Sequence, residues 1–140
     1  MITFQTSGVD MPKIDLKKIS EWIGLVAASH NRKVGNVNYC FCDDSEILRN
    51  NRQFLGHDYF TDVITFDYSR HLRISGDILI SLDTVASNAQ TLHVAYDREL
   101  LRVIIHGILH LCGIDDKAPG QREIMERAEN KALDIYDHTL

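Results

Sequence analysis

The chain has 140 residues, of which 44% are hydrophobic and 25% are charged, and its formal net charge is −5 at pH 7. This length fits one domain over residues 1–140 that buries a core without disulfides. The acidic balance argues against a protein that coats nucleic acid non-specifically, because such proteins are basic. We find neither a signal-peptide pattern nor an apolar run that could span a membrane, so we expect a cytoplasmic protein without membrane contacts.

Hydrophobic periodicity predicts the following elements in chain order. Alternating or β-rich runs predict strands over residues 2–5, 34–42, 61–66 and 76–81. Amphipathic runs predict helices over residues 15–28, 46–55, 97–111 and 121–136, and a further helix capped by Ser81 or Asp83 that ends near Leu92. The linker over residues 67–75 is compatible with a loop or a hairpin. Strands concentrated in the first half, with helices around them, indicate an α+β fold.

Polar residues at the predicted helix starts are candidate caps. Asp44 or Ser45 is expected to cap the helix over residues 46–55, and Asp97 the helix that ends near Leu111. This last helix is apolar nearly all round, so we expect it to be the central, buried one. The three cysteines form no CxxC pair, and Cys40 and Cys42 are spaced to share one strand face, which favours reduced, buried thiols.

The most informative segment lies at the end of the central helix. His106 and His110 are four residues apart, so their imidazoles share one helix face. Gly113 stands where a helix ends in a left-handed residue, and the chain can then turn back. Asp116 would complete a three-ligand metal site, with Asp115 as the competing third ligand. The pattern favours this site over two histidines with a purely structural role.

Three chemistries use such a ligand set. Zinc proteases place a glutamate directly after the first histidine, whereas this chain has Gly107 there. A metal-assisted phosphodiesterase needs no such base, because the ion lowers the pKa of its bound water and polarises a substrate oxygen. Non-haem iron oxygenases also use two histidines and a carboxylate, usually on a β-scaffold. Gly107 is explained either by close helix packing or by room for a substrate backbone beside the metal.

Three blocks of sequence resemble one known family. Residues 106–115 (HGILHLCGID) resemble the signature of the YbeY family of bacterial endoribonucleases and rRNA maturation factors. Thr61–Phe66 (TDVITF) and Gly76–Ile78 (GDI) resemble two strand motifs of that family, in the same order and spacing. The matched blocks span about half the chain, from Asn51 to Asp116.

The resemblance implies a fold and a function. The fold would be a small mixed four-stranded sheet packed against about five helices, with the metal site on a central helix. The activity would be zinc-dependent cleavage of single-stranded RNA, without an organic cofactor. The implied role is late 3′-end maturation of the 16S rRNA precursor and ribosome quality control, with the ribosome or its small subunit as partner.

The chain departs from the family pattern at two positions. Asp116 stands where the family has a third histidine, which makes the site less positive and harder, so that manganese or iron could compete better with zinc. Leu55 stands where the family usually has an arginine suited to gripping phosphate. Either Arg52 or His57 replaces that arginine, or the chain is a weak nuclease.

We therefore expect a zinc-dependent endoribonuclease in which His106, His110 and Asp116 hold the metal and a bound water acts in catalysis. No protein base is evident, and Asp62, Asp77 and Asp115 are expected to be structural acids or partners of the ligand imidazoles. The alternative is a ribosome-assembly factor whose metal is structural or weakly catalytic. A metalloprotease is a distant third. The chain has three basic clusters: Lys13, Lys17 and Lys18; Arg32 and Lys33; and Arg49 and Arg52. The sequence alone does not place these clusters relative to the metal.

Overall fold

The computed structural model describes residues 1–56 and 61–139. Within them the strands are β1 (Ile2–Thr6), β2 (Lys33–Cys42), β3 (Val63–Asp67) and β4 (Arg73–Ser81). The helices are α1 (Leu16–Ser29), α2 (Asp44–Asn50), α3 (Leu82–Leu92), α4 (Tyr96–Leu111) and α5 (Gln121–Asp137), and a short π-helical segment, η1 (Asn51–Leu55), follows α2. The predicted α+β fold is confirmed.

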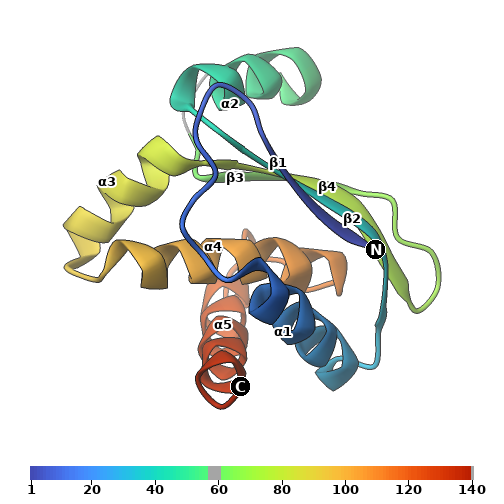
Figure 1. Ribbon diagram of the computed structural model, residues 1–140. Coiled ribbons are helices and arrows are strands. Elements are labelled where there is room, and N and C mark those ends of the chain that lie inside the picture. Colours follow the sequence, from blue (N-terminus) through green and yellow to red (C-terminus); the bar gives the residue numbers. More distant parts are fainter. Residues whose placement is uncertain (57–60, 140) are drawn as a thin grey trace.

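The sheet has the strand order β1-β2-β4-β3. β1, β2 and β4 run parallel, and β3 pairs antiparallel with β4 at one edge, so the sheet is mixed. Helix α2 lies over one face of the sheet, whereas α1, α4 and α5 lie beneath the other face (Figure 1). None of the helices in the described part of the chain combines the length and apolar character of a membrane span.

The main core lies between the sheet and the helices α1, α4 and α5. Alternate residues of β2 point into it, namely Val37, Tyr39 and Phe41, and all three are fully buried. On the opposite face Cys42 packs with Ile47 of α2 in a smaller cluster. The three cysteines are free thiols. α4 buries most of its circumference, as its sequence predicts.

Two buried polar contacts fix how the helices sit. The hydroxyl of Tyr39 donates to the carbonyl of Ile104 at 2.7 Å, which ties β2 to the middle of α4. The indole nitrogen of Trp22 donates to the carbonyl of Ala132 at 2.6 Å, which ties α1 to α5. Because an unmade buried hydrogen bond is costly, the first contact restricts sliding of α4 along β2, and the second restricts sliding of α1 along α5.

Two predicted helix starts were wrong. The α2 cap is Asp43, whose carboxylate accepts from the backbone N–H of Glu46 at 2.9 Å, and not Asp44 or Ser45. α4 begins one residue before Asp97, so this residue lies in the first turn, where its charge interacts favourably with the helix dipole. The expected single helix over residues 46–55 is divided between α2 and η1.

Gly107 is explained by packing. It is buried on the side of α4 that faces the sheet, and a Cβ there would lie 2.8 Å from Cδ1 and 3.0 Å from Cγ2 of Ile78. The glycine therefore lets α4 approach β4 closely. The alternative explanation, room for a substrate backbone, is wrong because Gly107 points into the core.

Substituting Gly107 should reveal this contact. Gly107→Ala gains up to about 1 kcal/mol of helix propensity, but the forced movement of Ile78 costs about 1–3 kcal/mol, so the variant should be less stable. Ile78→Val removes Cδ1, the nearest atom, and should recover about 1 kcal/mol in the double variant. Urea unfolding of the wild type, the two single variants and the double variant measures this coupling. Strictly additive changes in the free energy of unfolding would contradict it.

Candidate metal centre

α4 presents both predicted histidines on one face. His106 and His110 lie one turn apart, with ring centroids separated by 4.6 Å and ring planes at 83°. Their side chains are 17% and 25% exposed, in contrast to the buried residues around the rest of the helix. The two imidazoles therefore reach the same small space at the edge of the core.

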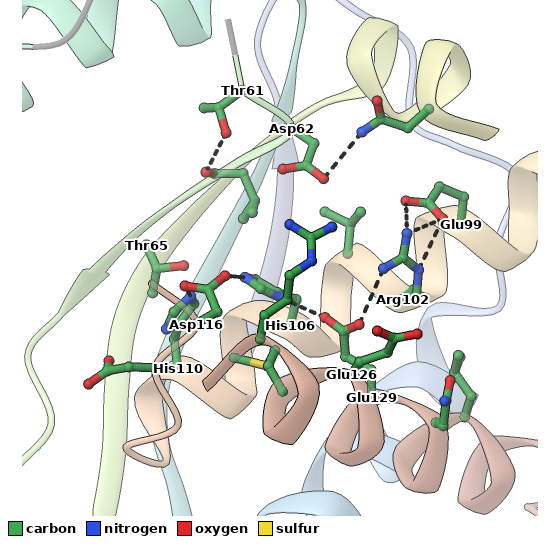
Figure 2. Close-up of a pocket in the computed structure, with 18 of the residues that line it drawn as sticks. Thr61, Asp62, Thr65, Glu99, Arg102, His106, His110, Asp116, Glu126 and Glu129 are labelled. Carbon is green, nitrogen blue, oxygen red and sulfur yellow. Dashed lines mark hydrogen bonds and ion pairs between the residues drawn. The ribbon is translucent and has the colours of Figure 1, made fainter. Parts of the chain in front are cut away.

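The chain then turns back and brings a carboxylate to the histidines. Gly113 has φ +96°, a left-handed conformation that favours glycine. After this turn, Asp116 places Oδ2 3.3 Å from Nε2 of His106 and Oδ1 3.5 Å from Nε2 of His110 (Figure 2). The neighbouring Asp115 is exposed and is not part of this cluster.

The spacing of these three side chains fits a metal ion. Each of His106, His110 and Asp116 offers one ligand atom, and these atoms lie within 4.8 Å of one another. A tetrahedral zinc ion with bonds of about 2.0–2.1 Å holds its ligand atoms about 3.3 Å apart. Each imidazole lies at about this distance from one of the two Asp116 oxygens, so the three side chains are close enough to share one ion.

A second carboxylate orients one imidazole. Oε2 of Glu129, on α5, lies 2.6 Å from Nδ1 of His106. Because a carboxylate accepts hydrogen bonds, Nδ1 carries a hydrogen, and Nε2, which faces Asp116, is the nitrogen left to bind a metal ion. Oε1 of Glu129 accepts from Arg102 at 3.2 Å, and Arg102 also forms a bidentate pair with Glu99. The two carboxylates are almost completely buried, so this network fixes the position of Glu129.

Sequence reasoning missed Glu129. A signal was present, because Met125, Glu129, Ala132 and Leu133 follow the spacing of a buried helix face, and a glutamate within such a stripe needs a partner. Of the acids proposed in its place, Asp77 accepts a hydrogen bond from Asn38 on the neighbouring strand at 3.0 Å.

Asp62 has a different place from Asp77. It lines the groove beside the histidines, where burial raises its pKa above the usual value. Figure 2 shows it on the opposite side of the groove from Glu129.

The two imidazoles have different affinities for protons. Burial alone would lower the pKa of His106, but the hydrogen bond and charge of Glu129, with the charges of Asp116 and Asp62, raise it above its usual value. Burial and the nearby charge of His106 lower the pKa of His110, and Asp116 offsets this only in part. His110 is therefore mainly neutral at pH 7, the form in which imidazole binds metals.

Comparison with known proteins assigns the family. Residues 1–137 match the family described as Endoribonuclease YbeY. The chain belongs to the YbeY family. Proteins named Endoribonuclease YbeY are 63% identical in Phocaeicola vulgatus over 95% of this chain and 96% of that protein, and 61% identical in Bacteroides thetaiotaomicron over 94% and 96%. The solution structure of TM1509 from Thermotoga maritima is 29% identical, with a TM-score of 0.68, and covers 97% of this chain and 89% of that one.

In this YbeY-family chain the cluster lies in a groove of about 1650 Å³. β3, α4, α5 and the loop after Gly113 form its walls. Thr65 of β3 also lines it, and within the described residues its hydroxyl is the one buried side-chain oxygen without a hydrogen-bond partner. This hydroxyl is therefore a polar group that the described part of the protein leaves without a partner beside the groove.

Among the charged side chains that line the groove, carboxylates outnumber cations. The carboxylates are Asp62, Asp67, Glu99, Asp115, Asp116, Glu126, Glu129, Asp134 and Asp137. The cations are Arg98, Arg102, Lys117 and Arg122, of which Arg98 is paired with Asp137 and Arg102 with Glu99 and Glu129. None of the three basic clusters noted in the sequence contributes to the described lining.

Leu55, the second position at which the resemblance suggested a departure from the family pattern, also lies at the groove. Leu55, at the end of η1, is 44% exposed and lines the groove, whereas its neighbour Arg52 is not among the described lining residues. His57, the other suggested replacement for the family arginine, lies outside the described residues. The described part of the groove thus presents an apolar side chain at this position.

Removing Glu129 should destabilise the protein and release His106. Glu129→Ala leaves His106 and Arg102 without their shared acceptor, at a cost of about 2 kcal/mol, because Arg102 is partly solvated. Urea unfolding measures this loss, and nitrogen NMR of the imidazole should show that the Nδ1–H tautomer is no longer dominant. Glu126→Ala, which removes an exposed carboxylate from the same helix, should change stability by less than about 0.5 kcal/mol. Equal effects of the two substitutions would refute the role of Glu129.

Proposed function

We propose that this protein is a zinc-dependent endoribonuclease that cleaves single-stranded RNA in the cytoplasm. We propose further that it acts in late 3′-end maturation of 16S rRNA and in ribosome quality control, in contact with the small subunit. The observation that carries the proposal is the convergence of one ligand atom each from His106, His110 and Asp116 within 4.8 Å of one another, inside a groove. The membership of the YbeY family supports the choice of RNA as substrate.

The residues of the chain have separate tasks in this reaction. His106 and His110 would hold the ion through Nε2, and Asp116 through its carboxylate. A zinc ion in this position supplies a Lewis acid that polarises a phosphoryl oxygen. Glu129 engages Nδ1 of His106, which leaves Nε2 as the atom that would bind the ion.

The geometry disfavours peptide hydrolysis by the usual zinc-protease arrangement. In that arrangement the residue after the first histidine supplies the carboxylate that acts as general base. Here that residue is Gly107, and its side of α4 packs against Ile78 in the core. A carboxylate at this position would point away from the groove and could not reach a substrate.

Metal content tests the ligand set. The purified wild type should contain about one zinc per chain, whereas His110→Ala and Asp116→Ala should lose it. Asp115→Ala is the matched control and should keep the metal, because Asp115 lies outside the cluster. Elemental mass spectrometry measures the three variants. Zinc retained in Asp116→Ala and lost in Asp115→Ala would transfer the third ligand to Asp115.

Cleavage of RNA tests the activity. The zinc-loaded protein should cut a single-stranded RNA, lose this activity on chelation and regain it when zinc is added back. Asp115→Ala should remain active, and Asp116→Ala should lose most of the activity. Stoichiometric zinc without any cleavage would instead favour the ribosome-assembly factor with a structural metal.

A further inference from the structure

The β3–β4 connection forms a tight and well-anchored turn. Arg70 and Arg73 exchange two backbone hydrogen bonds of 3.0 Å, which leaves His71 and Leu72 as the two turn residues. His71 has φ +54°, a left-handed conformation that usually selects glycine in such hairpins. The side chain of Arg32 donates to the carbonyl of His71 at 3.0 Å and helps to hold this turn.

A basic hollow lies beside this turn. It has a volume of about 500 Å³ and is lined by Lys33, Tyr68, Arg70, His71, Leu72, Arg73 and Ser75, with no carboxylate among the described lining residues. Lys33, Arg70 and Arg73 are exposed, and in the described part of the chain none of them has an ion-pair partner. The ring of Tyr68 is also 60% exposed. We call Lys33, Tyr68, Arg70 and Arg73 the hairpin patch.

The hairpin patch adjoins the metal groove. Thr65 lines the groove, and Tyr68 follows three residues later on the same segment, about 10 Å along an extended chain. Arg32 joins the two regions, because its second terminal nitrogen donates to the carbonyl of Cys112 at 3.3 Å, two residues after His110. Figure 1 shows the β3–β4 hairpin and the C-terminal end of α4 at the same end of the molecule.

We propose that the hairpin patch binds a segment of single-stranded RNA that extends out of the metal groove. This inference rests on the proposed function and adds a binding surface to it. Nine carboxylates face four cations in the described lining of the groove, and Arg98 and Arg102 are paired with carboxylates, so the groove by itself attracts a polyanion weakly. The patch supplies three unpaired cations for phosphates and one exposed aromatic ring on which a base can stack, the combination that binds single strands without sequence preference.

Binding of labelled single-stranded RNA tests the patch cations. Triple substitution of Lys33, Arg70 and Arg73 by Ala should lower the slope of log K against log salt by about 2, because each phosphate contact on a single strand contributes about 0.7. The matched control replaces Lys13, Lys17 and Arg127 by Ala, which removes the same charge from exposed positions outside both surfaces. An equal slope for the two triple variants would overturn the proposal. Unchanged thermal unfolding would show that both proteins are folded.

Tyr68 gives an independent test that leaves the charge unchanged. Tyr68→Ala should weaken RNA binding roughly 5- to 100-fold, the range for loss of one stacked base, whereas Tyr68→Phe should bind like the wild type. Equal binding by the two variants would overturn the stacking role.

Cleavage kinetics separate the failure of the patch from the failure of the proposed function. The patch variants should raise KM for a long RNA and leave kcat unchanged, because the patch lies away from the reacting bond. If the wild type cleaves RNA and the patch variants have the same KM and the same salt slope, the RNA-binding role of the hairpin patch is wrong and the proposed nuclease function is unaffected. Patch-dependent RNA binding without cleavage would support the patch and overturn the function. Binding of an acidic protein in place of RNA would overturn the RNA assignment.

Discussion

The hydrogen bond between His106 and Glu129 joins the two helices on which the site depends. α4 is covered by the sheet and by neighbouring helices around most of its circumference, and the strip with Arg102, His106 and His110 faces the groove. Glu129 is buried, and its carboxylate needs the hydrogen bonds that Arg102 and His106 of α4 donate. The same contacts therefore fix both the crossing of α4 with α5 and the orientation of the His106 ring. The contacts Tyr39–Ile104 and Trp22–Ala132 hold the same helices from their other sides.

The groove combines opposing electrostatic demands. Its carboxylates suit a cation but repel a nucleic acid, and Asp116 places one of these negative charges directly beside the two histidines. A divalent ion offsets two of these charges at the point where a phosphate must approach. The charge is therefore divided between two surfaces: the groove has an excess of carboxylates, which suits the cation, and the hairpin patch has an excess of cations, which suits the polyanion.

Local sequence rules predicted much of this architecture. Within the described residues, periodicity located the strands and the α-helices but did not separate α2 from η1, and the histidine spacing with Gly113 placed the candidate site at the end of α4. These features depend on residues close together in the chain. Glu129 was missed because it meets His106 across 23 residues and a helix crossing, which local spacing does not specify. The side of α4 on which Gly107 lies likewise became clear only from the contact with Ile78.

The order in which the elements occur along the chain has a consequence for synthesis. A nascent polypeptide that has emerged as far as α4 already carries both histidines, but Asp116 and Glu129 follow later. The acceptor that orients His106 arrives only when α5 has emerged and docked on α4. The candidate metal cluster is therefore complete only after Asp116 and α5 have been synthesised, and a nascent chain that has not yet reached Asp116 carries the two histidines without their third candidate ligand.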